Sequence, residues 1–346
     1  MRVASKSFRK EQQHTDLWSL GVLPVLSAGV FLGLLGVYWD IAWHIDLGRH
    51  TFFSPPHNLI YAGMLAVLAT SLWGLWRDRR DTALHLPLGR LRLHPGLLIV
   101  AVGAALVLLF APLDELWHRW FGEELTLWAP MHLIGLLSLT LATFGGLVTA
   151  WVEQLVADSR AKKGPFMTLT LAFAALLLGW MMLWLAEYEF NVPQFPTLWH
   201  PILLAGLPSF VLVFIARLHP SAWAATWTAL LFTTFRLAFA GWLTLTVSFE
   251  WAGDSRPLIP MLILSGLTVD LFARRGAAGW LQGVAAGAVT LAVNAIWIHF
   301  SDVVWYEDVV LAAALPGLAL AAFCGWLGGQ AAEQLSERRT GQDQGR

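Results

Sequence analysis

The segment that decides the fold is an uncharged run at residues 17–39, LWSLGVLPVLSAGVFLGLLGVYW, which ends directly at Asp40. Its 23 residues are enough to cross the hydrocarbon core of a bilayer as one helix. The run is longer than the apolar core of a secretory signal peptide, and no small-residue cleavage site follows it. We therefore expect it to be retained as the first membrane span.

The remainder of the chain continues this pattern. Hydrophobic residues make up 57% of the 346 residues and charged residues only 13%, which is far more apolar than a typical soluble domain. Repeated uncharged runs predict an all-α, polytopic integral membrane protein of about ten transmembrane helices arranged as five hairpins. The expected spans cover approximately residues 17–39, 57–76, 95–117, 131–153, 165–187, 200–217, 221–249, 257–273, 276–300 and 308–331.

The distribution of lysine and arginine predicts the orientation of these spans. Of the 22 basic residues, 18 fall in the N-terminal segment, the C-terminal tail and alternate loops, whereas the opposite loops hold only Arg49, Arg119 and Arg256. Because cytoplasmic loops are enriched in positive charge, we expect both termini to be cytoplasmic in a bacterial-type inner membrane. The expected regions are a cytoplasmic segment 1–16, a metal-binding four-helix region 17–153, a six-helix region 154–331 and a cytoplasmic tail 332–346.

Composition also excludes several kinds of site and partner. The net charge is −1, so the charge gives no reason to expect nucleic acid as a partner, and the lipid bilayer is the expected one. Cys324 is the only cysteine, which excludes an internal disulfide and a metal centre held by several thiolates. A bound metal ion would therefore be held by histidine and carboxylate side chains.

A pattern that occurs twice supplies such ligands. Residues 40–57 read DIAWHIDLGRHTFFSPPH, and residues 114–132 read DELWHRWFGEELTLWAPMH. Both contain Asp-x-x-Trp-His, followed after a short gap by Pro-x-His at the start of the next apolar run. The Asp and the first His are four residues apart, so they share one face of a helix.

The two copies predict two metal sites, formed by Asp40, His44 and His57 and by Asp114, His118 and His132. An unpaired carboxylate near the hydrocarbon boundary is costly, so an aspartate at the end of an uncharged run favours a bound cation. Two imidazoles and one carboxylate with open positions suit Cu(II), Zn(II) or non-haem Fe(II). The charge distribution places both sites toward the extracytoplasmic side.

Two further features lie beyond the repeated pattern. Glu187 and His200 form a weaker candidate for a third site, because they flank an outer turn in which an acid, a proline and a histidine follow in the same order. Arg236 falls inside the seventh expected span, where arginine is costly and is usually paired or functional. Neither Glu250 nor Asp270 is an obvious direct partner for it, so its role stays open.

The first copy resembles the copper-site segment of the C subunit of the particulate methane and ammonia monooxygenases. That segment carries an Asp/His/His copper site with the spacing of Asp40, His44 and His57, and the flanking matches are Arg49, Thr51, Phe53 and Pro55. The second copy is similar to a second cluster of the family, with Asp114 in place of an Asn and with Glu123 and Glu124 at a Glu-Glu pair. The resemblance covers about residues 36–136.

This resemblance implies copper as the cofactor, in preference to zinc or non-haem iron, and a copper monooxygenase subunit as the function. A small apolar or neutral substrate would reach the sites from the membrane, and the partners would be other monooxygenase-type subunits or copies of the same chain. Two alternatives stay open from the residues. One is a protein that transports or delivers copper or zinc, with Arg236 along its path. The other is a metal-free, proton-coupled transporter that uses His and Asp titration.

Overall fold

The computed structural model describes residues 21–48, 51–78, 84–88, 91–122, 126–157, 160–244, 257–301 and 303–343. These residues are almost entirely helical, with one short β-hairpin. In chain order the elements are α1 (Val22–Leu47), α2 (Pro55–Arg77), β1 (Leu86–Leu88), β2 (Leu91–Leu93), α3 (Pro95–Phe121), α4 (Pro130–Val156), α5 (Arg160–Met182), η1 (Leu183–Leu185), α6 (Ala186–Glu189), α7 (Trp199–Leu218), α8 (Ala224–Trp242), α9 (Ile263–Arg274), α10 (Gly279–Trp297), η3 (Ile298–Phe300) and α11 (Glu307–Asp343).

Eight helical segments within these ranges are long and apolar enough to cross a membrane, which confirms the expected all-α, multi-pass membrane protein. They are Val22–Leu47, Pro55–Arg77, Pro95–Phe121, Pro130–Val156, Lys163–Glu189, Trp199–Leu218, Gly279–Phe300 and Glu307–Glu337.

Two of the ten expected spans, 221–249 and 257–273, correspond to α8 and α9, which are not among these eight. α8 is less apolar because it carries Arg236 and several threonines. α9 has 12 residues, so it rises only about 18 Å, well short of the roughly 30 Å of a bilayer core. Within the described ranges the structure therefore supports eight of the ten expected spans, and residues 245–249 of the seventh expected span lie outside these ranges.

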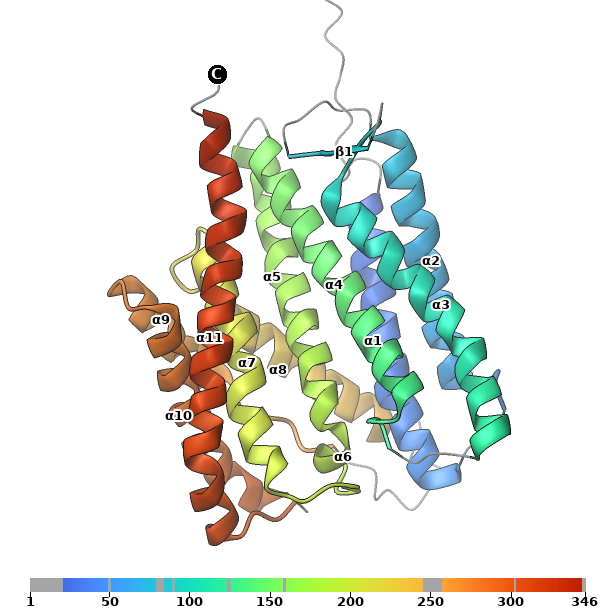
Figure 1. The fold of residues 1–346 in the computed structure, drawn as a ribbon, viewed down its shortest axis with the longest axis vertical. Helices are drawn as coiled ribbons and strands as arrows, with labels where there is room; N and C mark the ends of the chain where they lie inside the picture. Colours follow the sequence, from blue (N-terminus) through green and yellow to red (C-terminus); the bar gives the residue numbers. More distant parts are fainter. Residues whose placement is uncertain are drawn as a thin grey trace, which may run out of the picture.

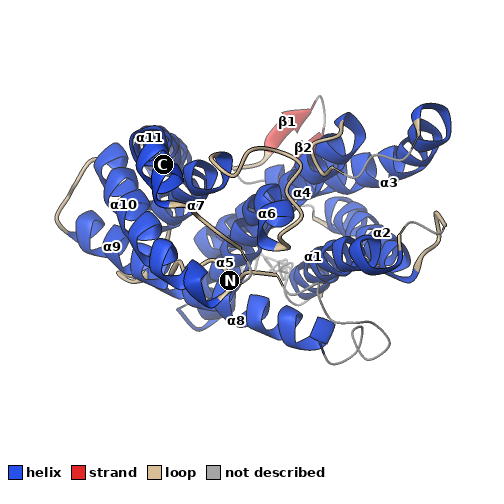
Figure 2. Ribbon diagram, turned by 90° about the horizontal axis from the view of Figure 1, so that it is seen from below, coloured by secondary structure: helices blue, strands red, loops and turns tan. Residues whose placement is uncertain are grey.

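The helices form one bundle in which α1 packs against α2 and α3 packs against α4. These four helices lie together on one side of the molecule, and α7, α10 and α11 lie on the other, with α5 between the two groups (Figure 1; Figure 2). α7 packs along α11, although the two are far apart in the sequence. The α1–α2 and α3–α4 turns lie at the same end of the bundle, the lower end in Figure 1.

A β-hairpin that the sequence did not indicate connects α2 to α3 at the opposite end of the bundle (Figure 1). Its strands pair antiparallel, with Leu86 opposite Leu93 and Leu88 opposite Leu91. The hairpin lies in the basic segment 77–94, at the end of the bundle away from the two motif turns.

Glycines allow the helices that carry the repeated motif to approach closely. A Cβ atom at Gly103 of α3 would lie 2.5 Å from the backbone nitrogen of Ala142 in α4. A Cβ atom at Gly63 of α2 would lie 2.8 Å from the carbonyl oxygen of Gly29 in α1. Small residues at helix interfaces are a common means of close packing in membranes. This packing brings together the helix ends that carry the Asp and His residues.

Candidate metal centres

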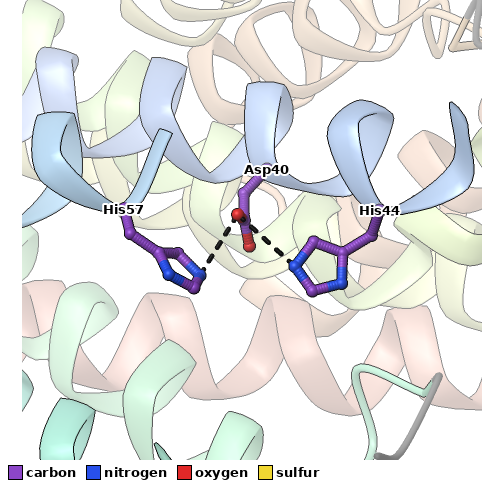
Figure 3. A group of neighbouring side chains, drawn as sticks. All are labelled: Asp40, His44 and His57. Carbon is purple, nitrogen blue, oxygen red and sulfur yellow. Dashed lines mark ion pairs between the residues drawn. The ribbon is translucent and has the colours of Figure 1, made fainter. Parts of the chain in front are cut away.

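The first copy of the motif folds into a cluster of three side chains at the α1–α2 turn. Asp40 and His44 lie one helical turn apart near the end of α1, and His57 is the third residue of α2, which begins with two prolines. Asp40 Oδ1 is 3.2 Å from His57 Nε2 and 3.6 Å from His44 Nε2. Figure 3 shows the carboxylate between the two imidazoles.

The second copy forms an equivalent cluster at the α3–α4 turn. Asp114 Oδ1 is 3.4 Å from His118 Nε2 and 3.5 Å from His132 Nε2, and the two Nε2 atoms are 3.4 Å apart. In each cluster, every residue offers one ligand atom within 4.8 Å of the other two. Both triads predicted from the sequence are therefore assembled, and both could hold a metal ion.

Backbone carbonyls determine which ring nitrogen carries the proton in three of these histidines. A carbonyl only accepts hydrogen bonds, so a neutral imidazole that bonds to one through Nδ1 carries its proton on Nδ1. The bonds are His57 Nδ1 to the Phe52 carbonyl at 3.1 Å, His118 Nδ1 to the Gly122 carbonyl at 3.3 Å and His132 Nδ1 to the Thr126 carbonyl at 2.8 Å. Each Nε2 lone pair is then left facing an aspartate.

In each triad, a lone pair on an imidazole Nε2 therefore faces a lone pair on the aspartate oxygen. Asp40 Oδ1 and Asp114 Oδ1 are buried and accept no hydrogen bond from the part of the chain that the structure describes. Lone pairs that face one another at such distances repel unless a cation lies between them. Metal-ligating histidines have this arrangement, with the second ring nitrogen donating to a carbonyl or a carboxylate. The donor set thus fits a divalent ion.

The distances at the second triad also match a metal ion. Its three ligand atoms are separated by 3.4, 3.4 and 3.5 Å, which makes a nearly equilateral triangle. A point equidistant from them lies about 2.0 Å from each in their plane, or about 2.1 Å from each at the centre of a tetrahedron, as in zinc bound to imidazole and carboxylate. Three protein ligands leave at least one coordination position open.

Glu187 and His200, the weaker candidates, are not brought together as a third ligand set. Glu187 Oε1 accepts hydrogen bonds from Thr126 Oγ1 and from the N–H of Leu127, each 2.6 Å long. His200 has no exposed surface, and its Nδ1 accepts a hydrogen bond from Trp305 Nε1 at 3.0 Å. Neither belongs to a possible metal group within the described ranges. Glu187 instead holds the turn that precedes α4.

Arg236 has a direct partner that the sequence did not indicate. Its Nη2 atom lies 2.8 Å from Glu189 Oε2, and both side chains have 0% exposure. Arg236 also donates to the Tyr38 hydroxyl, and its guanidinium carbon lies 3.9 Å from the centroid of that ring. The ion pair compensates the buried charge. Arg236 therefore ties α8 to α1 and α6, and its guanidinium is already engaged in these contacts.

Two further acid–histidine pairs lie at the other end of α2, α3 and α4. His85 Nε2 is 3.3 Å from Asp78 Oδ2, and His94 Nε2 is 3.5 Å from Glu153 Oε1. All four side chains are almost completely buried. His94 Nδ1 accepts a hydrogen bond from the N–H of Leu97 and caps α3, so a neutral His94 carries its proton on Nε2 and directs it at Glu153. This arrangement suits a helix cap rather than a metal ligand.

Some positions of the motif lie outside the described residues, namely Arg49, His50, Glu123 and Glu124. No family model matches the chain, and neither a curated protein nor a solved structure matches it.

Proposed function

We propose that the protein is an integral membrane copper protein in which each Asp/His/His triad binds one copper ion, and that it acts as a copper-dependent monooxygenase or as a subunit of one. One observation carries this proposal. In each triad, imidazole Nε2 atoms converge on a buried aspartate oxygen that accepts no hydrogen bond from the described residues. Such a set of donors is satisfied by a dication.

The choice of copper rests on ligand type and on the sequence resemblance. Imidazole and carboxylate ligands without thiolate suit Cu(II), and both segments, 40–57 and 114–132, resemble copper-site segments. Copper held there would supply reversible one-electron redox chemistry and an open coordination position for O2. Zinc and non-haem iron suit the same ligands but lack the support of the resemblance.

The residues of each triad have distinct tasks in this proposal. The aspartates supply a negative charge, and the histidines supply neutral donors, with the tautomers of His57, His118 and His132 selected by backbone carbonyls. The side chains of His44 and His132 are 35% and 25% exposed, whereas those of His57 and His118 are 14% and 6% exposed. Each site therefore has one histidine through which an ion and small molecules could reach it from the surroundings.

The location follows from the distribution of basic residues. Both triads lie at one end of the bundle, and the β-hairpin that follows α2 in the basic part of the sequence lies at the other (Figure 1). By the excess of Lys and Arg in cytoplasmic loops, we assign the triads to the extracytoplasmic side of a bacterial-type inner membrane, with both termini cytoplasmic. Substrate would then reach the sites from the outer half of the bilayer.

The metal-free alternative fits the second triad less well. Protonation of both His118 and His132 would place two Nε2–H groups 3.4 Å apart, and a single proton joins only two of the three facing atoms. Transport along a path through Arg236 loses its support, because that side chain is buried in an ion pair with Glu189. The exposure of His44 favours metal delivery as the second candidate function.

Oxygen consumption separates the oxygenase from a metal carrier. Monooxygenation places one oxygen atom in the substrate and reduces the other to water, which consumes two electrons and two protons. The copper-loaded protein is therefore supplied with a quinol as reductant and with ammonia or a short alkane. We expect O2 uptake coupled to hydroxylated product, and its loss in Asp40→Ala and Asp114→Ala. Tight copper binding with no oxygen uptake in the presence of reductant would identify a carrier instead.

A further inference from the structure

We propose that Glu187 is a positioning residue of the second metal site, and that it acts on His132 through the turn formed by Thr126–Ala129. This inference rests on the proposed function, because it assumes that the triad of Asp114, His118 and His132 binds an ion. Glu187 lies about 60 residues from this turn in the sequence, so the sequence alone did not indicate this role.

The contacts of Glu187 converge on one end of this turn. Its side chain is buried, and a single oxygen, Oε1, accepts both the Thr126 hydroxyl and the Leu127 N–H at 2.6 Å. The other oxygen accepts the N–H of Gln194 at 3.3 Å. The two 2.6 Å bonds to Oε1 are short and involve a charged acceptor, so they are stronger than ordinary hydrogen bonds between neutral groups. Glu187 therefore joins the segment that follows α6 to the turn that precedes α4.

Thr126 passes this restraint to the metal site. Its hydroxyl donates to Glu187 and accepts the N–H of Trp128 at 3.1 Å. Its carbonyl accepts His132 Nδ1 at 2.8 Å and the N–H of Ala129 at 3.3 Å. Thr126, which is held by Glu187, thus carries the carbonyl that sets the tautomer and ring orientation of His132. Partners of this kind change metal affinity by about 10- to 100-fold when they are removed.

The first site is anchored differently, which makes it an internal control. The carbonyl that accepts His57 Nδ1 belongs to Phe52, in a turn closed by a hydrogen bond from the N–H of Ser54 to the Thr51 carbonyl at 3.2 Å. Asn58 adds a bond to the Phe53 carbonyl at 2.9 Å. These bonds are local, so a change at Glu187 should leave the first site intact while it alters the second.

The test compares Cu(II) binding in Glu187→Ala, Glu187→Gln and Thr126→Val, each in a His57→Ala background that leaves only the second site to be titrated. We expect Glu187→Ala to weaken binding about 10- to 100-fold and to change the copper hyperfine pattern. Glu187→Gln should recover most of the affinity, because one oxygen carries both bonds to the turn. Thr126→Val should resemble Glu187→Ala. Glu115→Gln removes a carboxylate next to Asp114, together with its ion pair to Arg119, and controls for the loss of negative charge near the site.

Three outcomes would overturn the inference. One is an unchanged affinity and spectrum in Glu187→Ala. Another is equal loss at both sites when His57 is intact, which would indicate general misfolding. The third is an equal loss in Glu115→Gln. If the wild type binds no copper, the proposed function fails, and Glu187 is tested in metal-free protein instead. There, Glu187→Ala should increase carbethoxylation of His132 relative to His57, and an unchanged ratio would contradict the positioning role.

Discussion

The Nε2 atoms of His118 and His132 lie 3.4 Å apart although fourteen residues separate the two histidines. The helices that carry them pack closely enough that a Cβ atom at Gly103 would meet the backbone of Ala142. Both rings also donate through Nδ1 to backbone carbonyls. Helix packing and the position of the carbonyls thus hold lone pairs facing one another in the metal-free protein. Metal binding is the most direct explanation for this arrangement of side chains.

The charge of Asp114 should increase the affinity of the second site. Asp114→Asn keeps the shape of the side chain but removes the negative charge from the triad, so we expect Cu(II) binding at this site to weaken about tenfold or more, equivalent to ~1.4 kcal/mol or more. Titration followed by electron paramagnetic resonance measures the change. Asp46→Asn, at an acid near the first triad but outside it, is the control. Equal affinity in Asp114→Asn and the wild type would show that the negative charge of Asp114 does not strengthen copper binding.

The buried pair of Arg236 and Glu189 should be important for stability. Arg236→Met leaves a carboxylate with 0% exposure without its partner, and we expect a loss of about 3–5 kcal/mol in the free energy of unfolding. Replacement of both residues by Met should recover most of this loss. Arg119→Met breaks an exposed ion pair with Glu115 and should cost less than about 1 kcal/mol. Unfolding in detergent measures all four proteins, and equal losses in the two single variants would contradict this account.

Acid should destabilise the end of the bundle that holds His94. Burial lowers the pKa of His94 below its ordinary value of 6.5, and the neighbouring Glu153 carboxylate, 3.5 Å from Nε2, offsets part of that shift. The native state therefore favours the neutral ring, and the unfolded state binds the extra proton below the ordinary pKa. Stability should fall as the pH drops through that value.

His94→Asn tests this pH dependence, because Asn can cap a helix without titrating. The melting temperature of the wild type should fall between about pH 7.5 and about pH 5.5, and the decrease should be smaller in the variant. His219, whose pKa is also lowered by burial, remains in both proteins and contributes equally. Identical pH profiles for the wild type and His94→Asn would exclude the assigned role of His94.

The membrane orientation can be tested with single cysteines in a Cys324→Ala background. Phe53 lies in the α1–α2 turn and is 69% exposed, and Leu88 lies in the β-hairpin and is 62% exposed. A membrane-impermeant maleimide should label Phe53→Cys in intact cells and Leu88→Cys only after permeabilisation. The reverse pattern would place both triads on the cytoplasmic side.

Much of the fold could be predicted because uncharged runs identify membrane helices directly. Eight of the expected spans correspond to helices of sufficient length and hydropathy. The prediction was less accurate at α9, where 12 residues are too few to cross a bilayer in the same way. The contact between α7 and α11 could not be predicted, since it depends on side-chain packing between segments distant in the sequence.

The candidate site was predictable where it depended on local spacing. Residues four apart on a helix share a face, so the pairing of Asp40 with His44 followed from the sequence. The carbonyls that fix the histidine tautomers could not be predicted, because every residue has a carbonyl and its direction depends on how the turn folds. The partnership of Arg236 with Glu189 joins residues 47 positions apart. A charged residue at the end of an apolar run, as at Glu189, was the only available signal for it.

Metal content tests the central claim most directly. The purified protein is loaded with Cu(II), freed of excess ion and analysed by mass spectrometry for metal per chain, together with His57→Ala, His132→Ala and the double variant. His299→Ala, at an exposed histidine outside both triads, is the control. We predict two copper ions in the wild type and in the control, one in each single variant and none in the double variant. A wild type that retains no copper, or single variants that both retain two ions, would contradict the account.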